Sequence, residues 1–169
     1  MPRPPKIWLI SDTHFYHQVM VKECGWPPDY KEQVLRNCKQ LVAQQDILFH
    51  LGDVIFYKYP ELSLLLGEIP GKKILLYGNH DHKSKYWYMR NGFDFVAEQI
   101  IWEIFGVAIL FSHVPQPIPE YVDYNIHGHL HLGEVRSKGD YEFYSDKHIL
   151  VSPEKENFQP IDLQTLLNR

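Results

Sequence analysis

Short apolar runs followed by polar residues recur along the chain, and this pattern predicts buried strands that end in loops. The clearest runs are residues 7–10, 47–50, 74–77 and 107–111. Each is followed closely by Gly, Asp, Asn or His, residue types that favour loops and turns. We therefore expect strands whose ends carry polar side chains.

Two groups of apolar residues recur at spacings of three and four, as on the buried face of a helix. The first group lies between the first two runs and comprises Val34, Leu35, Cys38, Leu41 and Val42. The second lies between the next two and comprises Leu62, Leu65, Leu66 and Ile69. Pro60 precedes it, where the first helical turn tolerates proline. The first half is thus predicted to be β-α-β-α-β.

The second half has a strand-like pattern. Strands are expected at residues 98–105, 107–111, a short run ending at 126, 141–144 and 148–151. Gly106 is the expected hairpin turn, and the amphipathic stretch 161–167 is expected to cap the chain end. These elements predict an α/β protein with two sheets, and the pattern leaves their relative orientation open.

Composition narrows the class of protein. The 169 residues are 44% hydrophobic and 22% charged, which predicts one globular domain over residues 1–169. No stretch approaches the roughly 20 apolar residues of a membrane span, and the Pro-rich start does not resemble a signal peptide. Cys24 and Cys38 are expected to be free thiols in the cytoplasm. The net charge of −4 argues against binding an extended nucleic-acid duplex.

The residues just after the strands share one chemistry, because Asp, Asn and His dominate them. They are Asp12 and His14, then Asp53, then Asn79, His80 and Asp81, then His113, and finally His129 and His131. A single such residue has an ordinary structural explanation, since Asp and Asn populate loops and most histidines are not ligands. Because ligands collect at the carboxyl ends of strands in α/β sheets, the repeated set predicts metal binding there.

Spacing adds detail to this site. Residues two apart in an extended segment project to the same side, so Asp12 and His14 are able to converge on one ion, as are His129 and His131. The Asp53 carboxylate has two oxygens and is the candidate bridge between two cations. Glycines precede several ligands and permit positive φ or a close approach to the metals: Gly52, Gly78 and Gly128.

These residues form ordered motifs that resemble the five-motif signature of calcineurin-like metallophosphoesterases. The motifs are Ser11-Asp12-Thr13-His14, Gly52-Asp53, Gly78-Asn79-His80-Asp81, Ser112-His113 and Gly128-His129-Leu130-His131. The closing segment 157–161 is similar to the end of small single-domain bacterial and phage members. The resemblance covers nearly the whole chain and implies a four-layer α/β/β/α sandwich.

The resemblance also implies a role for each motif residue. One metal would be held by Asp12, His14, Asp53 and His131, and the other by Asp53, Asn79, His113 and His129. His80 would donate to the phosphate or protonate the leaving oxygen, and Asp81 would orient His80. The implied activity is phosphoester hydrolysis by a metal-bridging hydroxide. The mixed ligands suit two divalent transition-metal ions, with manganese favoured over iron, zinc, cobalt or nickel.

This sequence differs from one branch of the family, and the difference bears on the substrate class. Protein phosphatases of this superfamily usually carry Asp-Arg-Gly after Gly-Asp and a phosphate-clamping Arg, whereas Val54-Ile55-Phe56 follow Asp53 here. A phosphodiesterase acting on small nucleotide-like diesters is therefore favoured. The alternatives are a phosphomonoesterase, a nuclease for short single strands, and a metal-binding scaffold without catalysis.

Aromatic residues near the motifs could form a base-stacking rim. They are Phe15, Tyr16, Phe56, Tyr57, Tyr59, Tyr86 and Trp87. Ordinary packing explains the same residues. No membrane partner is expected, and the sequence leaves the oligomeric state open.

Overall fold

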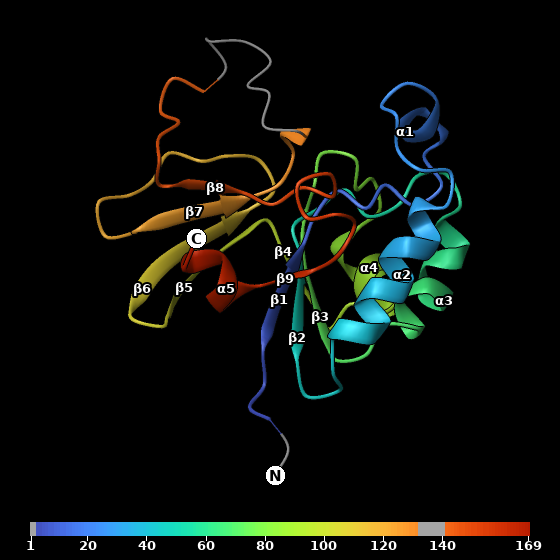
Figure 1. Ribbon diagram of the computed structural model, residues 1–169, viewed down its shortest axis with the longest axis horizontal. Coiled ribbons are helices and arrows are strands. Elements are labelled where there is room, and N and C mark those ends of the chain that lie inside the picture. The colour runs from blue at the N-terminus through green and yellow to red at the C-terminus, as the bar shows by residue number, and fades with distance from the viewer. Residues whose placement is uncertain (1–2, 132–140) are drawn as a thin grey trace.

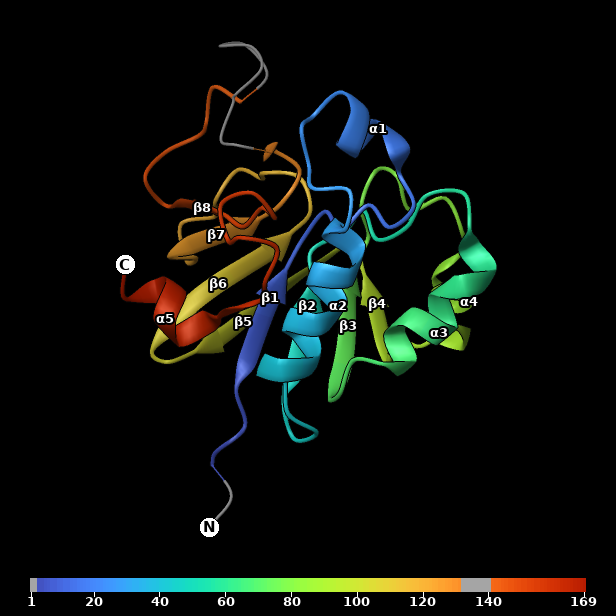
Figure 2. The same cartoon turned by 45° about the vertical axis from the view of Figure 1, so that its right-hand side comes forward.

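Two β-sheets form the centre of the protein in a computed structural model that describes residues 3–131 and 141–169. The first sheet has five strands in the order β4-β3-β2-β1-β9, and the second has four in the order β5-β6-β7-β8. Figures 1 and 2 show helices α2, α3 and α4 on one side of the first sheet and the second sheet on its other side. The predicted α/β class with two sheets is confirmed.

The first sheet and its helices come mainly from the first half of the chain. In order they are β1 (Ile7–Ile10), α1 (Gln18–Lys22), α2 (Tyr30–Leu41), β2 (Ile47–His50), a 3-10 turn (Tyr59–Glu61), α3 (Leu62–Gly67), β3 (Lys72–Leu76), α4 (Lys85–Arg90) and β4 (Phe95–Ala97). Strands β1 to β4 are mutually parallel. Their carboxyl ends, and the motifs that follow β1, β2 and β3, therefore lie along one edge of the sheet.

The second sheet follows directly in the chain. Its strands are β5 (Gln99–Ile104), β6 (Val107–Ser112), β7 (Tyr124–His127) and β8 (His148–Leu150), and the chain closes with β9 (Ile161–Asp162) and α5 (Leu163–Leu167). Phe105 and Gly106 both have positive φ, 55° and 80°, as a two-residue type I′ hairpin requires, so the turn predicted at Gly106 is confirmed. Strands β6, β7 and β8 are parallel, which brings their carboxyl ends together as well.

Two apolar cores hold these layers together. One lies between the first sheet and the helices, where Ile10 and Leu75 pack with Val34 of α2. The other lies between the two sheets and includes Phe49 and Phe111, whose rings stack at 5.1 Å between centroids. Burial of both faces of the first sheet explains why its strands read as continuous apolar runs.

Loops cover the outer face of the second sheet. The backbone N–H of Gln116 donates to Asn125 Oδ1 at 2.8 Å, and the hydroxyl of Tyr144 lies 3.0 Å from His127 Nε2. Helix α5 packs instead beside β1 and β9. In the described residues the fourth layer is thus built from loops.

Several sequence-based predictions need correction or extension. No strand forms at 141–144: residues 141–143 are a turn, and the Tyr144 ring stacks on that of His148 with centroids 4.6 Å apart. The stretch 161–167 begins with β9, antiparallel to β1, before α5 starts at the Asp162 cap. Helices α1 and α4 and strand β4 were not predicted, because each buries a single residue and so shows no repeated apolar spacing. No helix of the described chain has the length and apolar content needed to cross a bilayer.

Candidate metal centre

Main-chain hydrogen bonds join the loops that follow the strands. The N–H groups of Asp12 and His14 donate to the carbonyl oxygens of Gly52 and Asp53 at 2.9 and 3.0 Å. In the second sheet, Gly128 N donates to the His113 carbonyl at 2.9 Å. His129 N then donates to Asp12 Oδ2 at 3.0 Å, which connects the two sheets at the site. The residues predicted from separate strand ends are brought together here.

Two groups of ligand atoms result. In the first, the Asp12 group, Asp12 Oδ1 lies 3.9 Å from His14 Nε2 and 3.8 Å from His131 Nε2. In the second, the Asp53 group, which also includes His129, Asp53 Oδ2 lies 3.4 Å from His113 Nε2. Within each group the donor atoms lie within 4.8 Å of one another, as expected for atoms that surround one cation.

Asp53 lies between the two groups. Its Oδ2 is 3.8 Å from His14 Nε2 of the Asp12 group as well as 3.4 Å from His113 Nε2. Asn79, in the loop after β3, lies beside the Asp53 group, because its Oδ1 is 2.8 Å from His113 Nε2. All the predicted ligands therefore converge on one region.

In each aspartate one oxygen is hydrogen-bonded and the other faces the ligands. Asp12 Oδ2 accepts from the Ser11 hydroxyl and from His129 N, while Asp53 Oδ1 accepts from His80 N at 2.8 Å. Asp12 Oδ1 is buried and has no hydrogen-bond partner among the described residues. An unpaired buried carboxylate oxygen is costly, so a cation beside it fits the donor set.

Backbone conformation at the site is also unusual. Asp12, His14, Asp53 and His129 all have positive φ, between 41° and 68°. Non-glycine residues adopt this region rarely, and such strain clusters at functional sites. At Gly78 a Cβ would lie 2.1 Å from Asp53 Oδ1, and at Gly128 a Cβ would lie 1.9 Å from Ser11 Oγ. Neither glycine has room for a side chain beside the predicted ligands, and the expected close approach of these glycines to the metals stays a prediction.

A model of the family described as calcineurin-like phosphoesterase matches residues 5–165, nearly the whole chain. The chain belongs to this family. The fold and the motif resemblance predicted from the sequence are thereby confirmed.

Two of the proteins similar to this calcineurin-like phosphoesterase match it over most of their own length, and a third matches it over less than half. The uncharacterized protein MJ1445 of Methanocaldococcus jannaschii is 30% identical over 176 residues, which cover 96% of this chain and 89% of that protein. The gene 66 protein of Mycobacterium phage D29 is 30% identical over 80 residues, covering 44% of this chain and 40% of its own. The crystal structure of AQ665 from Aquifex aeolicus, a protein of unknown function, aligns with a TM-score of 0.81 and 26% identity over 98% and 99% of the two chains.

The histidines of the centre differ in charge. Burial lowers the pKa of His14 to about 3 and that of His129 to about 4. Burial also opposes charge on His113, but its hydrogen bond and charge interaction with Asp53, together with the charge of Asp12, raise the pKa of His113 to about 9. The ring of His113 is therefore charged near neutral pH, whereas His14 and His129 are neutral.

Asp81 has different partners from those predicted. Its carboxylate accepts from the N–H groups of Gly78, Asp53 and Val54 at 2.8 to 3.2 Å, and from the Tyr88 hydroxyl at 3.1 Å. No hydrogen bond joins Asp81 to the His80 ring among the described residues. Asp81 therefore fixes the backbone that carries Asp53, and the expectation that it orients His80 stays a prediction.

His80 itself faces the ligands from the Gly-Asn-His-Asp loop. Its ring centroid lies 5.7 Å from that of His14 and 5.1 Å from that of Phe56. Phe56 stacks on His17 at 3.9 Å, and Tyr57, 74% exposed, packs against its edge. Of the aromatic residues predicted to form a rim, Phe56 and Tyr57 adjoin the site, whereas Phe15 is a core residue.

The sequence reasoning did not assign a role to three groups that contact ligands. Ser11 bonds Asp12, the Leu51 carbonyl accepts from His113 Nδ1 at 2.7 Å, and Glu154 Oε1 lies 2.9 Å from His131 Nδ1. Ser11 is part of the first motif and could have been considered. A backbone carbonyl and a glutamate 23 residues from its partner give no local signal.

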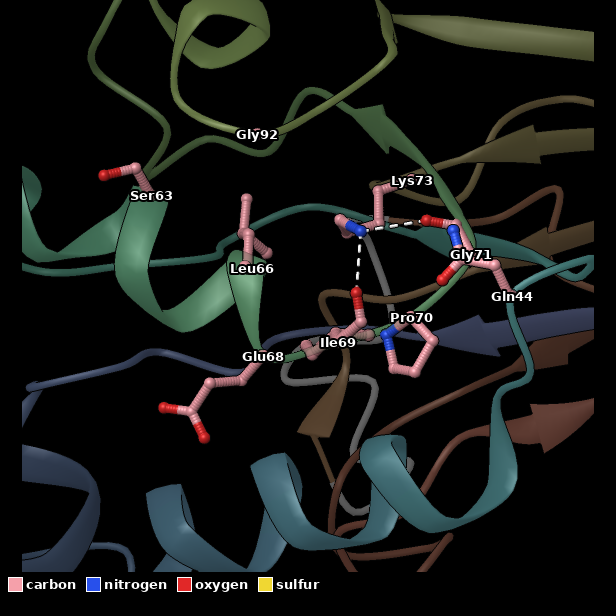
Figure 3. A pocket seen from close by; sticks show the side chains of 10 residues that line it. Gln44, Ser63, Leu66, Glu68, Ile69, Pro70, Gly71, Lys73 and Gly92 are labelled. Carbon is pink, nitrogen blue, oxygen red and sulfur yellow. Dashed lines mark hydrogen bonds between the residues drawn. The ribbon is translucent and has the colours of Figure 1, made fainter.

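A separate cavity of about 400 Å³ lies at the other end of β3 (Figure 3). There the Lys73 ammonium donates to the carbonyl oxygens of Ile69 and Gly71 at 2.8 and 2.9 Å. Its lining includes Ser63 and Gly92 but none of the predicted ligands. This cavity is therefore not part of the candidate metal centre.

Proposed function

We propose that this calcineurin-like phosphoesterase is a dinuclear metal-dependent hydrolase with a preference for small nucleotide-like phosphodiesters. The observation that carries the proposal is the position of Asp53 Oδ2, 3.8 Å from His14 Nε2 and 3.4 Å from His113 Nε2. A carboxylate oxygen between two sets of imidazoles supports a ligand that two cations would share. Membership of the family supports the hydrolase activity.

The ligands divide between two ions. Asp12, His14 and His131 with Asp53 would hold one, and Asn79, His113 and His129 with Asp53 would hold the other. Two bound cations would supply Lewis-acid activation of water and neutralise charge on the phosphate. Manganese is the first choice, because imidazole and carboxylate together suit transition metals better than calcium.

The protein residues around the ions complete the site. His80 is proposed as the general acid that protonates the leaving oxygen, since its loop lies beside Asp53 and its ring faces His14. Asp81 holds the Asp53 backbone in place. Phe56 and Tyr57 offer aromatic surface next to His80, which suits a flat leaving group.

The diester preference rests on charge recognition. A dianionic monoester favours a bidentate Arg fork. In the described residues Arg3 and Arg169 pair instead with Asp46 and Glu156. No arginine among the described residues hydrogen-bonds a ligand of either group.

The first test is a matched pair of variants. Asp53→Asn should lose bound metal and activity together, because the shared carboxylate charge is gone. His80→Ala should keep both ions and lose turnover by about 10²- to 10⁴-fold. Metal content by elemental analysis and rates on a panel of monoesters, linear diesters and cyclic nucleotides give the readout. Asp123→Asn, at an exposed position immediately before β7, is the control, because an amide oxygen still accepts the hydrogen bond that Ala108 N donates to Asp123 Oδ2 at 2.8 Å.

Three results would contradict parts of the proposal. Full activity in either site variant rejects the role assigned to that residue. A wide preference for monoesters rejects the diester assignment. Tight metal binding without turnover on any substrate favours the scaffold alternative.

A further inference from the structure

Glu154 connects a predicted metal ligand to a distant segment of the chain. Its Oε1 lies 2.9 Å from His131 Nδ1 and accepts from Trp26 Nε1 at 2.7 Å. The carboxylate is 12% exposed, and its other oxygen, Oε2, is buried without a partner among the described residues. Residues 26, 131 and 154 thus meet at one carboxylate oxygen.

The contact with His131 fixes that ring. An ionised carboxylate only accepts hydrogen bonds, so His131 Nδ1 must carry the proton. When the ring is neutral, Nε2 presents its lone pair toward Asp12 Oδ1, 3.8 Å away. A carboxylate bonded to the far nitrogen of a ligand histidine orients the ring and increases its basicity.

The contact with Trp26 ties a second segment to the same point. The Trp26 ring packs edge-on against Tyr30 and Phe158, with centroids 5.0 and 5.2 Å apart. It also lies 5.8 Å from the His131 ring. Met20 of α1 belongs to the same small core, and the Tyr30 hydroxyl donates to the His14 carbonyl at 2.6 Å. Residues 20–30 therefore pack against both His14 and His131.

We propose that Glu154 is a positioning residue of the metal centre, which holds His131 in its ligating orientation and anchors residues 20–30 over the Asp12 group through Trp26. This inference rests on the metal binding of the proposed function, not on its substrate preference. It predicts that one of two bound ions depends on Glu154 and that binding of this ion stabilises the Trp26 segment. The linkage works in both directions, because the same oxygen accepts both hydrogen bonds.

The experiment measures Mn²⁺ binding by titration calorimetry on the full chain. Glu154→Ala should weaken one of the two binding events by about 10- to 100-fold and leave the other within twofold. Glu154→Gln should weaken it less, because an amide oxygen still accepts from both donors. Trp26→Phe keeps an aromatic side chain in the small core but removes the indole N–H together with its five-membered ring, so it should preserve Mn²⁺ affinity more closely while raising hydrogen exchange in residues 20–30.

The matched control is Glu156→Gln. Glu156 belongs to the same segment and is also buried, but it pairs with Arg169 at 2.8 and 2.9 Å, and neither hydrogen bond involves a ligand. Both Mn²⁺ affinities should remain those of the wild type, even if the melting temperature falls. A general loss of stability would instead affect both glutamate variants and both ions alike.

The outcomes separate this inference from the proposed function. Wild-type protein that binds no ion overturns both. Two ions in the wild type with unchanged affinities in Glu154→Gln and Glu154→Ala overturn the role of Glu154 alone. If Glu154→Ala does not fold, Glu154→Gln and Trp26→Phe carry the test, and unchanged binding together with unchanged exchange in both rejects the proposal.

Discussion

The two ligand groups are held in place by different parts of the molecule. Main-chain contacts hold the Asp53 group: Asp81 accepts from Asp53 N, and the Leu51 carbonyl accepts from His113 Nδ1. The Asp12 group has main-chain hydrogen bonds from Asp12 N, His14 N and His129 N, and its ligand side chains also have side-chain partners in the Ser11 hydroxyl and Glu154. The side chain of His113 is 2% exposed and that of His131 is 22% exposed.

This difference suggests different tolerance to change. Sheet hydrogen bonds and packed loops fix a backbone more firmly than side chains with free rotamers do. We therefore expect the Asp53 group to be preorganised and sensitive to small displacements, and the Asp12 group to adapt. Variants and pH provide three ways to test the contrast.

The largest effect is expected for Gly78→Ala, which attacks the Asp53 group. The added Cβ would lie 2.1 Å from Asp53 Oδ1 and 2.4 Å from Asp53 N. Because Asp53 N belongs to the main chain, a change of side-chain rotamer does not relieve this clash. Because Asp53 lies between both groups, affinity for both ions should fall on the order of 100-fold. Titration calorimetry with Mn²⁺ measures the affinity for each ion.

Gly67→Ala is the control for this substitution. Gly67 ends α3, and a Cβ there meets no atom within 4 Å. It should leave metal affinity unchanged and alter stability by no more than about 1 kcal/mol. Equal metal binding in the two alanine variants would contradict the rigid Asp53 group.

The pH dependence of metal binding should give the next largest effect. The pKa of His113 is raised to about 9, chiefly by Asp53 and Asp12 against the opposing effect of burial, so a metal must displace its proton at neutral pH. Affinity should therefore fall as pH drops below 9, by about tenfold per unit while this one proton is displaced.

Two other ligand histidines provide a contrast to His113 in the same measurement. His14 and His129, with pKa values of about 3 and about 4, are already neutral at pH 7 and add no proton release there. Calorimetry in buffers of different ionisation enthalpy gives the number of protons released when the metal binds. Constant affinity between pH 6.5 and 9 would show that His113 is not displaced from a charged state.

The smallest effect is expected for Gly128→Ala, which attacks the Asp12 group. Its Cβ would lie 1.9 Å from Ser11 Oγ and 2.5 Å from Asp12 Oδ2, both of them side-chain atoms that are able to rotate. Mn²⁺ affinity should drop by about tenfold or less. A loss larger than that of Gly78→Ala would reverse the comparison between the two groups.

Much of the fold was predictable because local patterns carry it. Apolar runs predicted β1, β2, β3 and β6, and helical spacing predicted α2 and α3. Helix α4 and strand β4 were not predicted, because each buries a single residue and so shows no repeated apolar spacing. The prediction of a strand at 141–144 was wrong, because an alternating pattern does not show whether a sheet edge is available.

The sequence by itself determined the chemistry of the centre, because each strand-end motif contains its own ligand types and their order is local information. Only the tertiary structure decided that Asp81 supports the Asp53 backbone and that Glu154 and Trp26 meet at His131, whereas the family resemblance had already implied how the ligands are grouped. These relations depend on how two sheets and a terminal segment pack. Trp26 and Glu154 are 128 residues apart, and no local spacing encodes that contact.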